Sequence, residues 1–380
     1  MDRTVCFCNS NRAWGGGEKW HLEAALAMAE RGCRVFLMAG EGSELLERAR
    51  RHPEITSHAR RFSGVDFINP AAVASCAAFF RRNAIRRVVL GLPADMKAGG
   101  IAAKLAGVPG IFYRRGSALP VRDTVLNRFL YGKLISGLIV NSRETARMVF
   151  ADNPALIDKS KVHVLYNGIN IAAFDAALAA AEPVFRPGDG KFVIGNAGRL
   201  TSQKGQQYLL HMSRALLDAG RGHHLFLAGD GERRGELETL AGSLGLADTV
   251  RFTGFLGDMA PFWRSVDMFV LSSLWEGFGY VLAEAMLAEK PVIAFDGNSM
   301  PEIVRQGETG MLAAMPGADE SDADVGRRLA ERVLPLAENA GERARLAGNG
   351  RDYCRTTYDQ TRRMDDLHRL LWPEVAHGAS

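Results

Sequence analysis

Two acids and a glycine turn stand together in the second half of the sequence, in a pattern that could bind a phosphorylated ligand. Glu276 begins the turn, Gly277 and Gly279 form it, and Glu284 follows eight residues after the first acid. The apolar run 268–271 before the turn reads as a buried strand, and the apolar spacing after it reads as a helix. A helix that starts at a glycine turn presents unpaired N–H groups and the positive end of its dipole to an anion. Acids beside such a site suit sugar hydroxyls, so the pattern favours a ligand with both groups, such as a nucleotide-sugar.

Two cations follow another predicted strand earlier in the chain. The run 192–200 reads as a strand that ends near Gly198 and Arg199, and Lys204 stands five residues further on, where a helical pattern opens. The Arg guanidinium is a planar fork that matches phosphate oxygens, and the Lys ammonium is a compact charge. Two such cations at one strand exit indicate a binding site for a phosphate or a diphosphate.

These two segments resemble, in sequence and in order, the signature segments of a known enzyme family. The run from Gly198 to Gly205 reads Gly-Arg-Leu-x-x-x-Lys-Gly and is similar to the family's diphosphate-binding loop, and the turn at Glu276 is similar to its paired-glutamate motif. The family is that of the retaining GT-B glycosyltransferases of family four. The resemblance implies an α/β fold with two Rossmann-like domains that face a central cleft, and a C-terminal helix that returns to the N-terminal domain.

The predicted elements divide the chain in the way that the resemblance implies. Strand and helix patterns alternate in both halves, and 380 residues suit two domains. We expect a Rossmann-like acceptor-binding domain at 1–172 and a Rossmann-like nucleotide-sugar-binding domain at 190–358. The alanine-rich segment 172–190 would link the two domains, and 359–380 would hold the returning helix.

The resemblance also implies roles for the charged side chains. A sugar would move from a nucleoside diphosphate to an acceptor hydroxyl with retention of anomeric configuration. Arg199 and Lys204 would stabilise the charge that builds on the leaving diphosphate, because cations fixed beforehand favour the transition state. Glu276 would hold the donor-sugar hydroxyls, and Glu284 would take the ribose hydroxyls. We therefore expect Arg199, Lys204 and Glu276 to be the catalytic residues.

The expected donor-binding set includes residues outside these two motifs. The glycines 15–17 precede a predicted helix and let the backbone approach a ligand closely, and the resemblance makes this the loop that faces the cleft. Asn167 belongs to an Asn-Gly turn of the family, and Phe252 to a stretch that lies against the nucleobase in relatives. The full set comprises Gly16, Gly17, Asn167, Gly198, Arg199, Lys204, Gly229, Phe252, Glu276, Gly277, Phe278, Gly279, Val281 and Glu284.

Three other functions remain open. A glycine-rich loop also occurs in dinucleotide-binding oxidoreductases, although 15–17 lacks the Gly-x-Gly-x-x-Gly spacing and no acidic ribose partner is evident near the end of the second strand. A sugar-nucleotide epimerase shares the GT-B fold. A non-catalytic module would bind a nucleotide-sugar without turning it over.

Polar residues after two predicted strands of the first half are candidates for binding the acceptor. Asp95 and Lys97 lie in 92–97, which reads as a loop at the carboxyl end of a strand, where open α/β sheets bind ligands. Arg114 and Arg115 follow the next strand and would clamp an acidic or phosphorylated acceptor. Relatives often carry a histidine where Arg114 stands, so we transfer no histidine role to this chain.

Charge is divided unevenly between the halves. Residues 1–170 hold 25 Lys and Arg against 14 Asp and Glu, a net charge of +11, and the remainder carries −7. The segment 121–136 reads as a basic amphipathic helix, which can rest on an anionic membrane. We expect the acceptor to be a glycolipid or saccharide, as in lipopolysaccharide or polysaccharide synthesis, with peripheral membrane contact through the basic half. No nucleic-acid motif is present, so nucleic acid is not an expected partner.

Composition bounds the remaining questions of metal, cofactor and location. The five cysteines lack zinc-ligand spacing, and Cys6 and Cys8 alternate as small buried side chains on one strand face. No Asp-x-Asp clamp follows a predicted strand, so we expect activity without a metal and without any cofactor beyond the co-substrate. No apolar run reaches the length of a membrane span, and the N-terminus lacks a signal-peptide layout. The expected location is the cytoplasm or the inner face of the cytoplasmic membrane.

Overall fold

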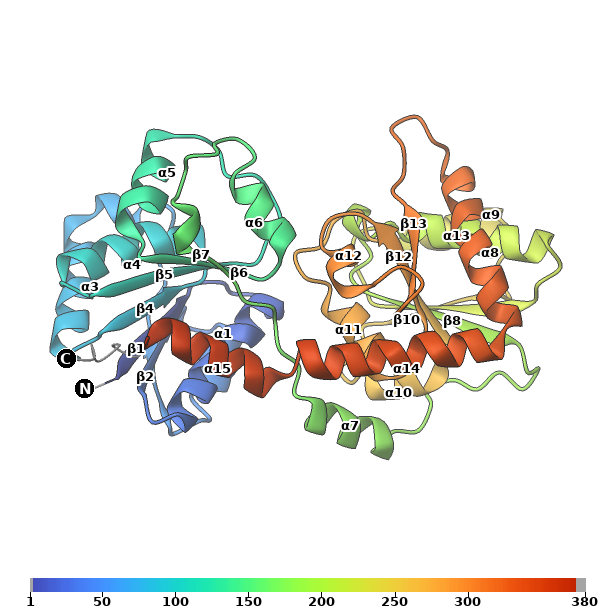
Figure 1. Ribbon diagram of the computed structural model, residues 1–380, viewed down its shortest axis with the longest axis horizontal. Coiled ribbons are helices and arrows are strands. Elements are labelled where there is room, and N and C mark those ends of the chain that lie inside the picture. Colours follow the sequence, from blue (N-terminus) through green and yellow to red (C-terminus); the bar gives the residue numbers. More distant parts are fainter. Residues whose placement is uncertain (1–2, 374–380) are drawn as a thin grey trace, which may run out of the picture. The chain divides into compact units, whose positions relative to one another are not determined.

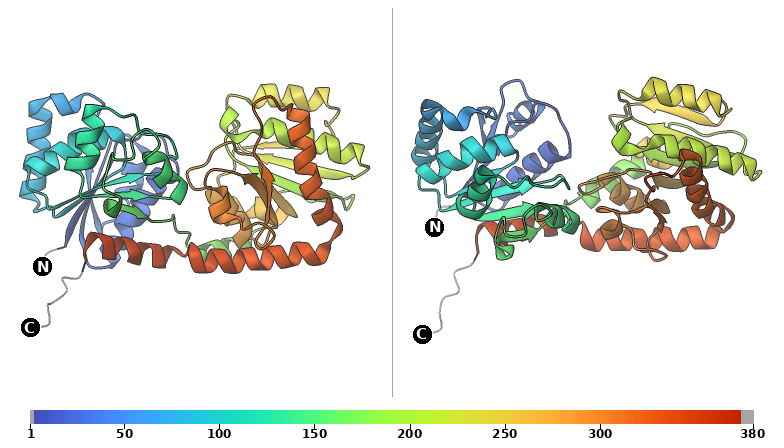
Figure 2. Two further views of the ribbon diagram at one scale, coloured as in Figure 1. Left: turned by 45° about the horizontal axis from the view of Figure 1, so that its top comes forward. Right: turned by 90° about the horizontal axis from the view of Figure 1, so that it is seen from above.

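The computed structural model describes residues 3–373 of the chain, and these form two compact units (Figure 1). The chain passes from the first unit to the second after Gly168 and returns to the first after Asp359. Each unit is an open parallel sheet with helices on both faces, as the further views show (Figure 2). The predicted α/β fold of two Rossmann-like sheets is confirmed.

The first unit has a seven-stranded sheet in the order β3-β2-β1-β4-β5-β6-β7, and all its neighbouring strands pair in parallel. The chain starts in the middle of the sheet, builds outwards to one edge, and then crosses back to build the other edge. The strands are β1 Thr4–Asn9, β2 Arg34–Ala39, β3 Ile55–Ala59, β4 Arg87–Leu90, β5 Gly110–Arg115, β6 Gly137–Val140 and β7 Val162–Val164.

Two separate cores cover the two faces of this sheet. In β1 the side chains of Val5 and Phe7 join one core and those of Cys6 and Cys8 join the other, as strand alternation requires. All four are fully buried, which confirms the expectation for the two cysteines. The helical elements of this unit are α1 Gly16–Glu30, α2 Glu44–Ala49, η1 Asp66–Ile68, α3 Pro70–Arg82, α4 Pro93–Leu105, α5 Val125–Phe129, η2 Leu130–Leu134, α6 Arg143–Val149, η3 Lys159–Lys161 and α15 Gln360–Leu371.

The last helix, α15, belongs to the first unit although it comes from the far end of the chain. Its Met364, Leu367 and Leu371 are buried in the core that α1 also lines. Arg31, which follows α1, forms an ion pair with Asp365 at 2.6 Å. The predicted return of the C-terminal helix to the N-terminal unit is therefore confirmed.

The second unit repeats the strand order of the first with one strand fewer, as β10-β9-β8-β11-β12-β13, again with every pair parallel. Its strands are β8 Phe192–Ala197, β9 His223–Ala228, β10 Val250–Gly254, β11 Met268–Leu271, β12 Val292–Asp296 and β13 Met311–Ala314. Its helical elements are α7 Ile171–Ala180, η4 Ser202–Lys204, α8 Gln206–Asp218, α9 Arg234–Ser243, α10 Ala260–Ser265, α11 Tyr280–Leu287, α12 Met300–Ile303, α13 Asp322–Glu338 and α14 Ala340–Thr357.

Each sheet has one point where the order of its strands reverses. In the first unit this point lies between β1 and β4, and in the second between β8 and β11. The loops that leave two such neighbouring strands run apart, and they leave room for a ligand at the carboxyl ends of the strands. Both motifs that the sequence singled out, at 198–205 and at 276–284, leave the sheet at the second of these points.

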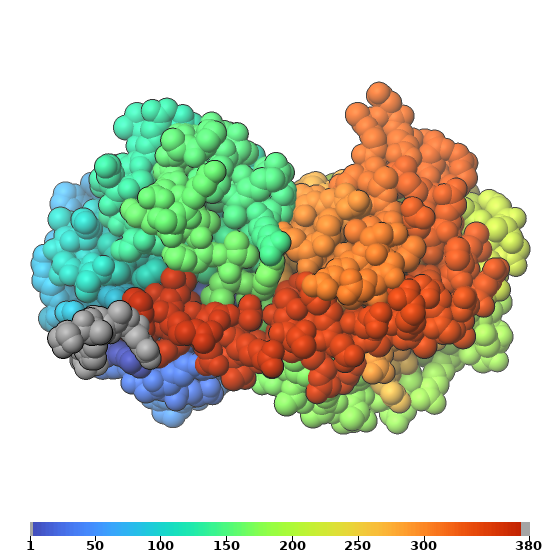
Figure 3. All heavy atoms as spheres, viewed as in Figure 1, coloured from blue at the N-terminus to red at the C-terminus, as the bar shows by residue number. Residues whose placement is uncertain are grey.

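Two predicted elements of the first unit differ from the structure. The segment 92–97 is not a loop, because Pro93 occupies the first turn of α4 and Asp95 accepts a hydrogen bond from the Leu92 amide at 2.9 Å. The segment 121–136 is not one amphipathic helix. Thr124 caps a helix that begins only at Val125, and after one turn this helix passes into a π-helical turn whose Leu130, Tyr131 and Leu134 are buried. The green-to-teal spheres of this part of the chain reach the surface of the first unit (Figure 3).

The segment 172–190 holds a helix as well as a linker. Asn170 accepts a hydrogen bond from the Ala173 amide at 3.0 Å and so starts α7, which the alanine-rich sequence then sustains to Ala180. The stretch that follows is irregular up to β8, where Pro183 and Pro187 oppose a helix.

Candidate functional site

The loop that leaves β8 is held in place by glycines that permit close backbone contact. A side chain at Gly229, which follows β9, would collide with the carbonyl of Gly198. One at Gly231 would collide with the carbonyl of Leu200 in the same way. The turn after β9 therefore packs directly on the loop after β8. Gly229, expected as a donor-binding residue, has this structural reason for being glycine.

Lys204 is placed by the residue that follows it. Gly205 has φ +61°, a left-handed conformation that ends η4 and lets α8 begin at once. A side chain at Gly205 would meet the carbonyl of Ser272, the first residue after β11. The Ser272 hydroxyl donates to the Lys204 carbonyl at 2.9 Å, so the loops after β8 and β11 are fastened together at this point.

The turn that carries Glu276 is shaped by hydrogen bonds from a distant segment. The Ser299 hydroxyl, fully buried, donates to the carbonyl of Glu276 at 3.0 Å and to that of Phe278 at 3.3 Å. The Asn298 side chain donates to the Leu274 carbonyl at 2.7 Å. Gly279, with φ +87°, then turns the chain into α11.

The two predicted motifs meet in an ion pair. The Nζ of Lys204 lies 2.5 Å from Oε1 of Glu276, across 72 residues of sequence. The Ser273 hydroxyl donates to the same Oε1 at 2.8 Å. The two charged side chains are only 16% and 10% exposed, so the pair is largely removed from water. The structure thus brings together the lysine and the first glutamate of the expected site.

The other charged residues of the expected site lie on the same two strand exits. Arg199 is exposed, and its guanidinium forms no hydrogen bond or ion pair with any described residue. Its carbonyl accepts from the Gln206 side chain at 2.9 Å, which fixes the backbone but leaves the cation available. Glu284 lies on the second turn of α11, because that helix begins at Tyr280 rather than at the glycine turn. Val281 is on the first turn and is half-buried.

An aromatic residue near this edge was not among the expected site residues. Phe252, which was expected to bind donor, is half-buried within the edge strand β10. Phe255, just beyond the end of that strand, is 82% exposed. The amide of Gly229 donates to the carbonyl of Gly254 at 2.8 Å, so Phe255 stands next to the loops of the site. Sequence spacing could not distinguish the two rings, because the difference is one of exposure.

In the first unit, the predicted residues are engaged with one another. Gly16 and Gly17 open α1, and the carbonyl of Gly17 lies 2.8 Å from Nδ1 of His21. Arg114 donates to the side chain of Asn167 at 2.9 Å. Burial and the nearby Arg114 guanidinium lower the pKa of His21 to about 3, so this histidine is neutral in the folded protein.

The four residues expected to bind the acceptor are also used by the fold. Asp95 is fully buried at the start of α4, and burial raises the pKa of its carboxyl to about 7. Arg115 is buried and donates to the Leu119 carbonyl at 2.5 Å. Lys97 lies 5.6 Å from the centre of the Phe67 ring. These contacts do not gather the four side chains into one open cluster, and their role toward an acceptor stays a prediction.

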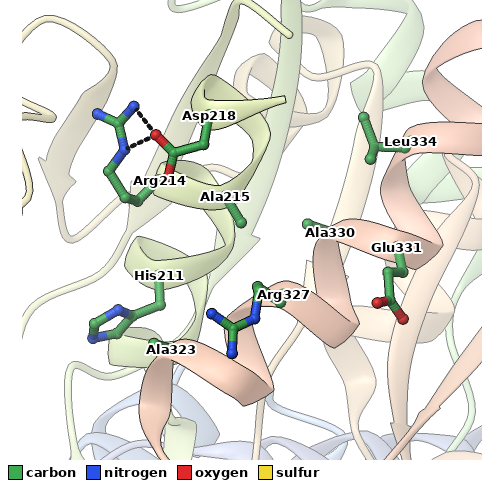
Figure 4. A pocket seen from close by; sticks show the side chains of 9 residues that line it. All are labelled: His211, Arg214, Ala215, Asp218, Ala323, Arg327, Ala330, Glu331 and Leu334. Carbon is green, nitrogen blue, oxygen red and sulfur yellow. Dashed lines mark hydrogen bonds and ion pairs between the residues drawn. The ribbon is translucent and has the colours of Figure 1, made fainter. Parts of the chain in front are cut away.

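One pocket of the second unit lies away from these charged groups. This pocket of about 270 Å³ opens between α8 and α13, where the Arg214–Asp218 ion pair lines its wall (Figure 4). It is lined by His211, Arg214, Ala215, Asp218, Ala323, Arg327, Ala330, Glu331 and Leu334. These residues come from the sides of two helices rather than from strand exits, and they bring no concentration of one charge. Residues 3–373 contain no group of three or more His, Cys, Asp or Glu side chains arranged to hold a metal. None of the described helices is both long enough and apolar enough to cross a membrane.

The sequence matches two family models that together cover most of the chain. The first is described as Glycosyltransferase Family 4 and matches residues 14–173. The second is described as Glycosyl transferases group 1 and matches residues 181–347, which include both motifs of the site.

Curated relatives match over part of their length. A glycosyltransferase of uncharacterised function from Methanocaldococcus jannaschii is 35% identical over 46% of this chain and 46% of its own. The lipopolysaccharide core biosynthesis glycosyltransferase LpsE of Rhizobium meliloti is 34% identical over 42% of this chain and 44% of its own. The chain therefore matches a little under half the length of each of these two relatives.

A solved structure matches nearly the whole chain. The Anabaena protein HepE, crystallised with UDP and glucose, has a TM-score of 0.79 and 20% identity, and the match covers 97% of this chain and 99% of that one. At this level of identity the likeness establishes the GT-B fold.

Proposed function

The chain belongs to glycosyltransferase family four, and from this premise we propose that it transfers a sugar from a nucleoside-diphosphate sugar to an acceptor hydroxyl with retention of configuration. The observation that carries the proposal is the meeting of Lys204 and Glu276 at the strand-order reversal of the second sheet. That is where an open α/β sheet binds its ligand. A nucleotide-sugar donor is supported by the similar structure of HepE, which was crystallised with UDP-glucose.

The cations in this site act on the leaving group. As the glycosidic bond breaks, negative charge builds on the diphosphate, and the sugar becomes oxocarbenium-like. Arg199, which is exposed, and Lys204, which is paired with Glu276, would bind the diphosphate oxygens. Because the loop is fixed by Gly205 and by hydrogen bonds to its carbonyls, little reorganisation is needed when that charge appears.

The glycine turn and α11 serve the rest of the donor. The start of α11 carries the positive end of the helix dipole, so backbone amides there would add to diphosphate binding. Glu276 would orient the sugar through its hydroxyls, and Glu284 would bind the ribose hydroxyls. No protein nucleophile is assigned. The leaving phosphate would accept the proton of the acceptor hydroxyl as the new bond forms on the same face of the sugar.

The acceptor in this proposal is a glycolipid or saccharide of lipopolysaccharide or polysaccharide synthesis, reached from the cytoplasm or from the inner face of the membrane. This acceptor class is supported by the similarity to LpsE, a lipopolysaccharide core biosynthesis glycosyltransferase, and by the surface residues around α5. There Val125 and Phe129 are 84% and 47% exposed, one helical turn apart. Arg122 and Lys133 are exposed beside them, and neither forms an ion pair with a described residue. Apolar side chains flanked by such cations suit an anionic lipid surface.

The experiment is a panel of uridine, guanosine and adenosine diphosphate sugars, with thermal shift to find the donor and mass analysis of products made with and without a candidate acceptor. The expected result is transfer to the acceptor by the wild type and strongly reduced transfer in Arg199→Ala, Lys204→Ala and Glu276→Ala. A changed sugar nucleotide in the absence of acceptor would instead identify an epimerase. Binding without either reaction or hydrolysis would identify a non-catalytic module. Wild-type transfer in all three variants would refute the site.

A further inference from the structure

The ion pair between Lys204 and Glu276 poses a problem for a site that binds an anion. The ammonium that should bind a diphosphate is already in contact with a carboxylate at 2.5 Å. Both side chains are largely buried, so solvent screens their interaction only weakly. A diphosphate that enters must therefore share or displace Glu276, and it also approaches a like charge.

Residues around the ion pair keep Lys204 and Glu276 in contact. The Ser273 hydroxyl donates to the same Oε1 that Lys204 contacts, and Ser273 is fully buried. The stem of Lys204 is also guided, because its Cε lies 3.4 Å from the position that a Cβ on Gly198 would take. Glu276 is fixed through its backbone by Ser299. The pair is thus built into the site by buried neighbours on both sides.

From this geometry we infer that the pair distinguishes the intact donor from the spent nucleoside diphosphate. The inference rests on the proposed function. An intact donor offers a diphosphate to Lys204 and sugar hydroxyls to Glu276, so each member exchanges its partner for a new one. A nucleoside diphosphate offers only the first. Its binding leaves Glu276 beside a like-charged group without a replacement donor, which is unfavourable for a buried carboxylate.

The consequence is a device for product release. Once the sugar has moved to the acceptor, Glu276 loses the hydroxyls, and the pair with Lys204 becomes its best remaining contact. Closing of the pair then competes with the diphosphate for the lysine and favours departure of the nucleotide. Glu276 would therefore determine donor specificity as well as orient the sugar.

The test is the affinity of Glu276→Gln for uridine and guanosine diphosphates, measured by titration calorimetry at low and high salt. The amide keeps the size and removes the charge, so the nucleoside diphosphate should bind about tenfold more tightly than to the wild type at low salt. The preference for the matching nucleotide-sugar over the diphosphate should shrink. Glu342→Gln removes a partly exposed acid paired with Arg345 on α14, and it should change neither affinity.

The possible outcomes separate the inference from the function it rests on. If the wild type binds no uridine, guanosine or adenosine diphosphate or diphosphate-sugar, the proposed function fails and the inference with it. If the wild type binds and Glu276→Gln binds the diphosphate equally or more weakly, the inference alone is overturned.

A second measurement needs no variant and keeps the inference testable if Glu276→Gln does not fold. In a crystal structure of the wild type with nucleoside diphosphate bound, the distance from Lys204 Nζ to Glu276 Oε1 should exceed about 4 Å, the limit of an ion pair. A pair that stays closed with the diphosphate in the site would overturn the inference.

Discussion

The first sheet runs β3-β2-β1-β4-β5-β6-β7 and the second runs β10-β9-β8-β11-β12-β13, so β1 and β4 correspond in position to β8 and β11. Both reversal points carry a glycine-bearing loop and a cluster of polar side chains. In the first unit those side chains contact one another, as Asn9 does with Glu18 at 3.2 Å and with His21 at 3.4 Å. In the second unit Arg199 has no partner among the described residues, and Lys204 is paired with Glu276, which in our proposal a ligand replaces.

The difference teaches how one fold can serve two purposes. Buried polar groups that hydrogen-bond one another rigidify a unit, although Nε2 of His21 and Oδ1 of Asp95 have no hydrogen-bond partner among the described residues. Cations that are exposed, or that are paired with a group that a ligand can displace, are able to bind an anionic ligand. We therefore expect changes at the second reversal point to alter chemistry more than stability, and changes in the first unit to do the reverse.

The largest effect should come from Lys204→Ala. Removal of one preorganised charge contact to a leaving diphosphate costs ~3 kcal/mol, so the transfer rate should fall roughly a hundredfold. Initial rates with the donor found in the panel give the measurement, and the folded state is checked by circular dichroism. Lys191→Ala, an exposed lysine paired with Asp189 in the same unit, is the matched control. An equal fall in transfer rate in both variants would mean that the rate depends on the net charge of the unit rather than on Lys204.

A smaller effect is expected from Ser299→Ala. The variant removes the hydroxyl that binds the carbonyls of Glu276 and Phe278, so the glutamate turn should loosen. A buried hydrogen bond contributes about 1–2 kcal/mol, which corresponds to roughly tenfold weaker binding of the nucleotide-sugar. Ser243→Ala is the control, because its hydroxyl binds only a carbonyl within α9. Unchanged affinity in Ser299→Ala would show that the turn keeps its shape without that bond.

Phe255→Ala should weaken nucleotide binding by a few-fold. The ring is largely exposed beside the site loops and would offer a flat apolar surface to a nucleobase, with a gain of about 1 kcal/mol. Titration with the nucleoside diphosphate alone gives the measurement, since the sugar is not involved. Val125→Ala, an equally exposed apolar residue in the first unit, should have no effect. A similar loss in both would place the base elsewhere.

Burial of a carboxyl group in the first unit should make the unfolding free energy depend on pH. Burial on α1 raises the pKa of Glu23 from 4.5 to about 7. The folded state therefore disfavours the ionised carboxyl, and this group's contribution to stability is fully present below about pH 4.5 and lost as pH rises through 7. Glu23→Gln should leave the unfolding free energy near that of the wild type at about pH 4.5. At about pH 8 the substitution should raise the unfolding free energy by about 1–2 kcal/mol. This is less than the pKa shift alone would give, because the Glu23 side chain is 23% exposed.

Urea unfolding of Glu23→Gln at the two pH values gives the measurement. Glu30→Gln, an exposed glutamate of the same helix, should be neutral at both. If Glu23→Gln destabilised the protein at the higher pH, the carboxylate would be a favourable partner of Lys19 rather than a buried charge, and the contrast between the two units would weaken.

The sequence predicted those features that depend on short-range patterns. The strand at 268–271 and the helix after the glycine turn were found where the apolar patterns placed them. The order of the two motifs also gave the fold class. The pairing of Lys204 with Glu276 was not predicted, although each was assigned to the same ligand.

Other features depend on contacts between distant segments and left no sequence signal. Ser299 shapes a turn more than twenty residues before it, and nothing in its neighbours indicates that role. The start of α4, by contrast, carries a local signal, since Pro93 lies in the first turn and Asp95 accepts a hydrogen bond from the Leu92 amide, but the segment was predicted as a loop. The prediction of one helix over 121–136 was wrong because Thr124 caps a helix that begins only at Val125.

The central claim is that the cations after β8 and the glycine turn after β11 bind one diphosphate. The most direct test is a crystal structure of the protein with a uridine or guanosine diphosphate sugar. We predict diphosphate oxygens within hydrogen-bonding distance of Lys204 Nζ and the Arg199 guanidinium, at the start of α11. A diphosphate bound anywhere else, such as between α8 and α13, would contradict the claim.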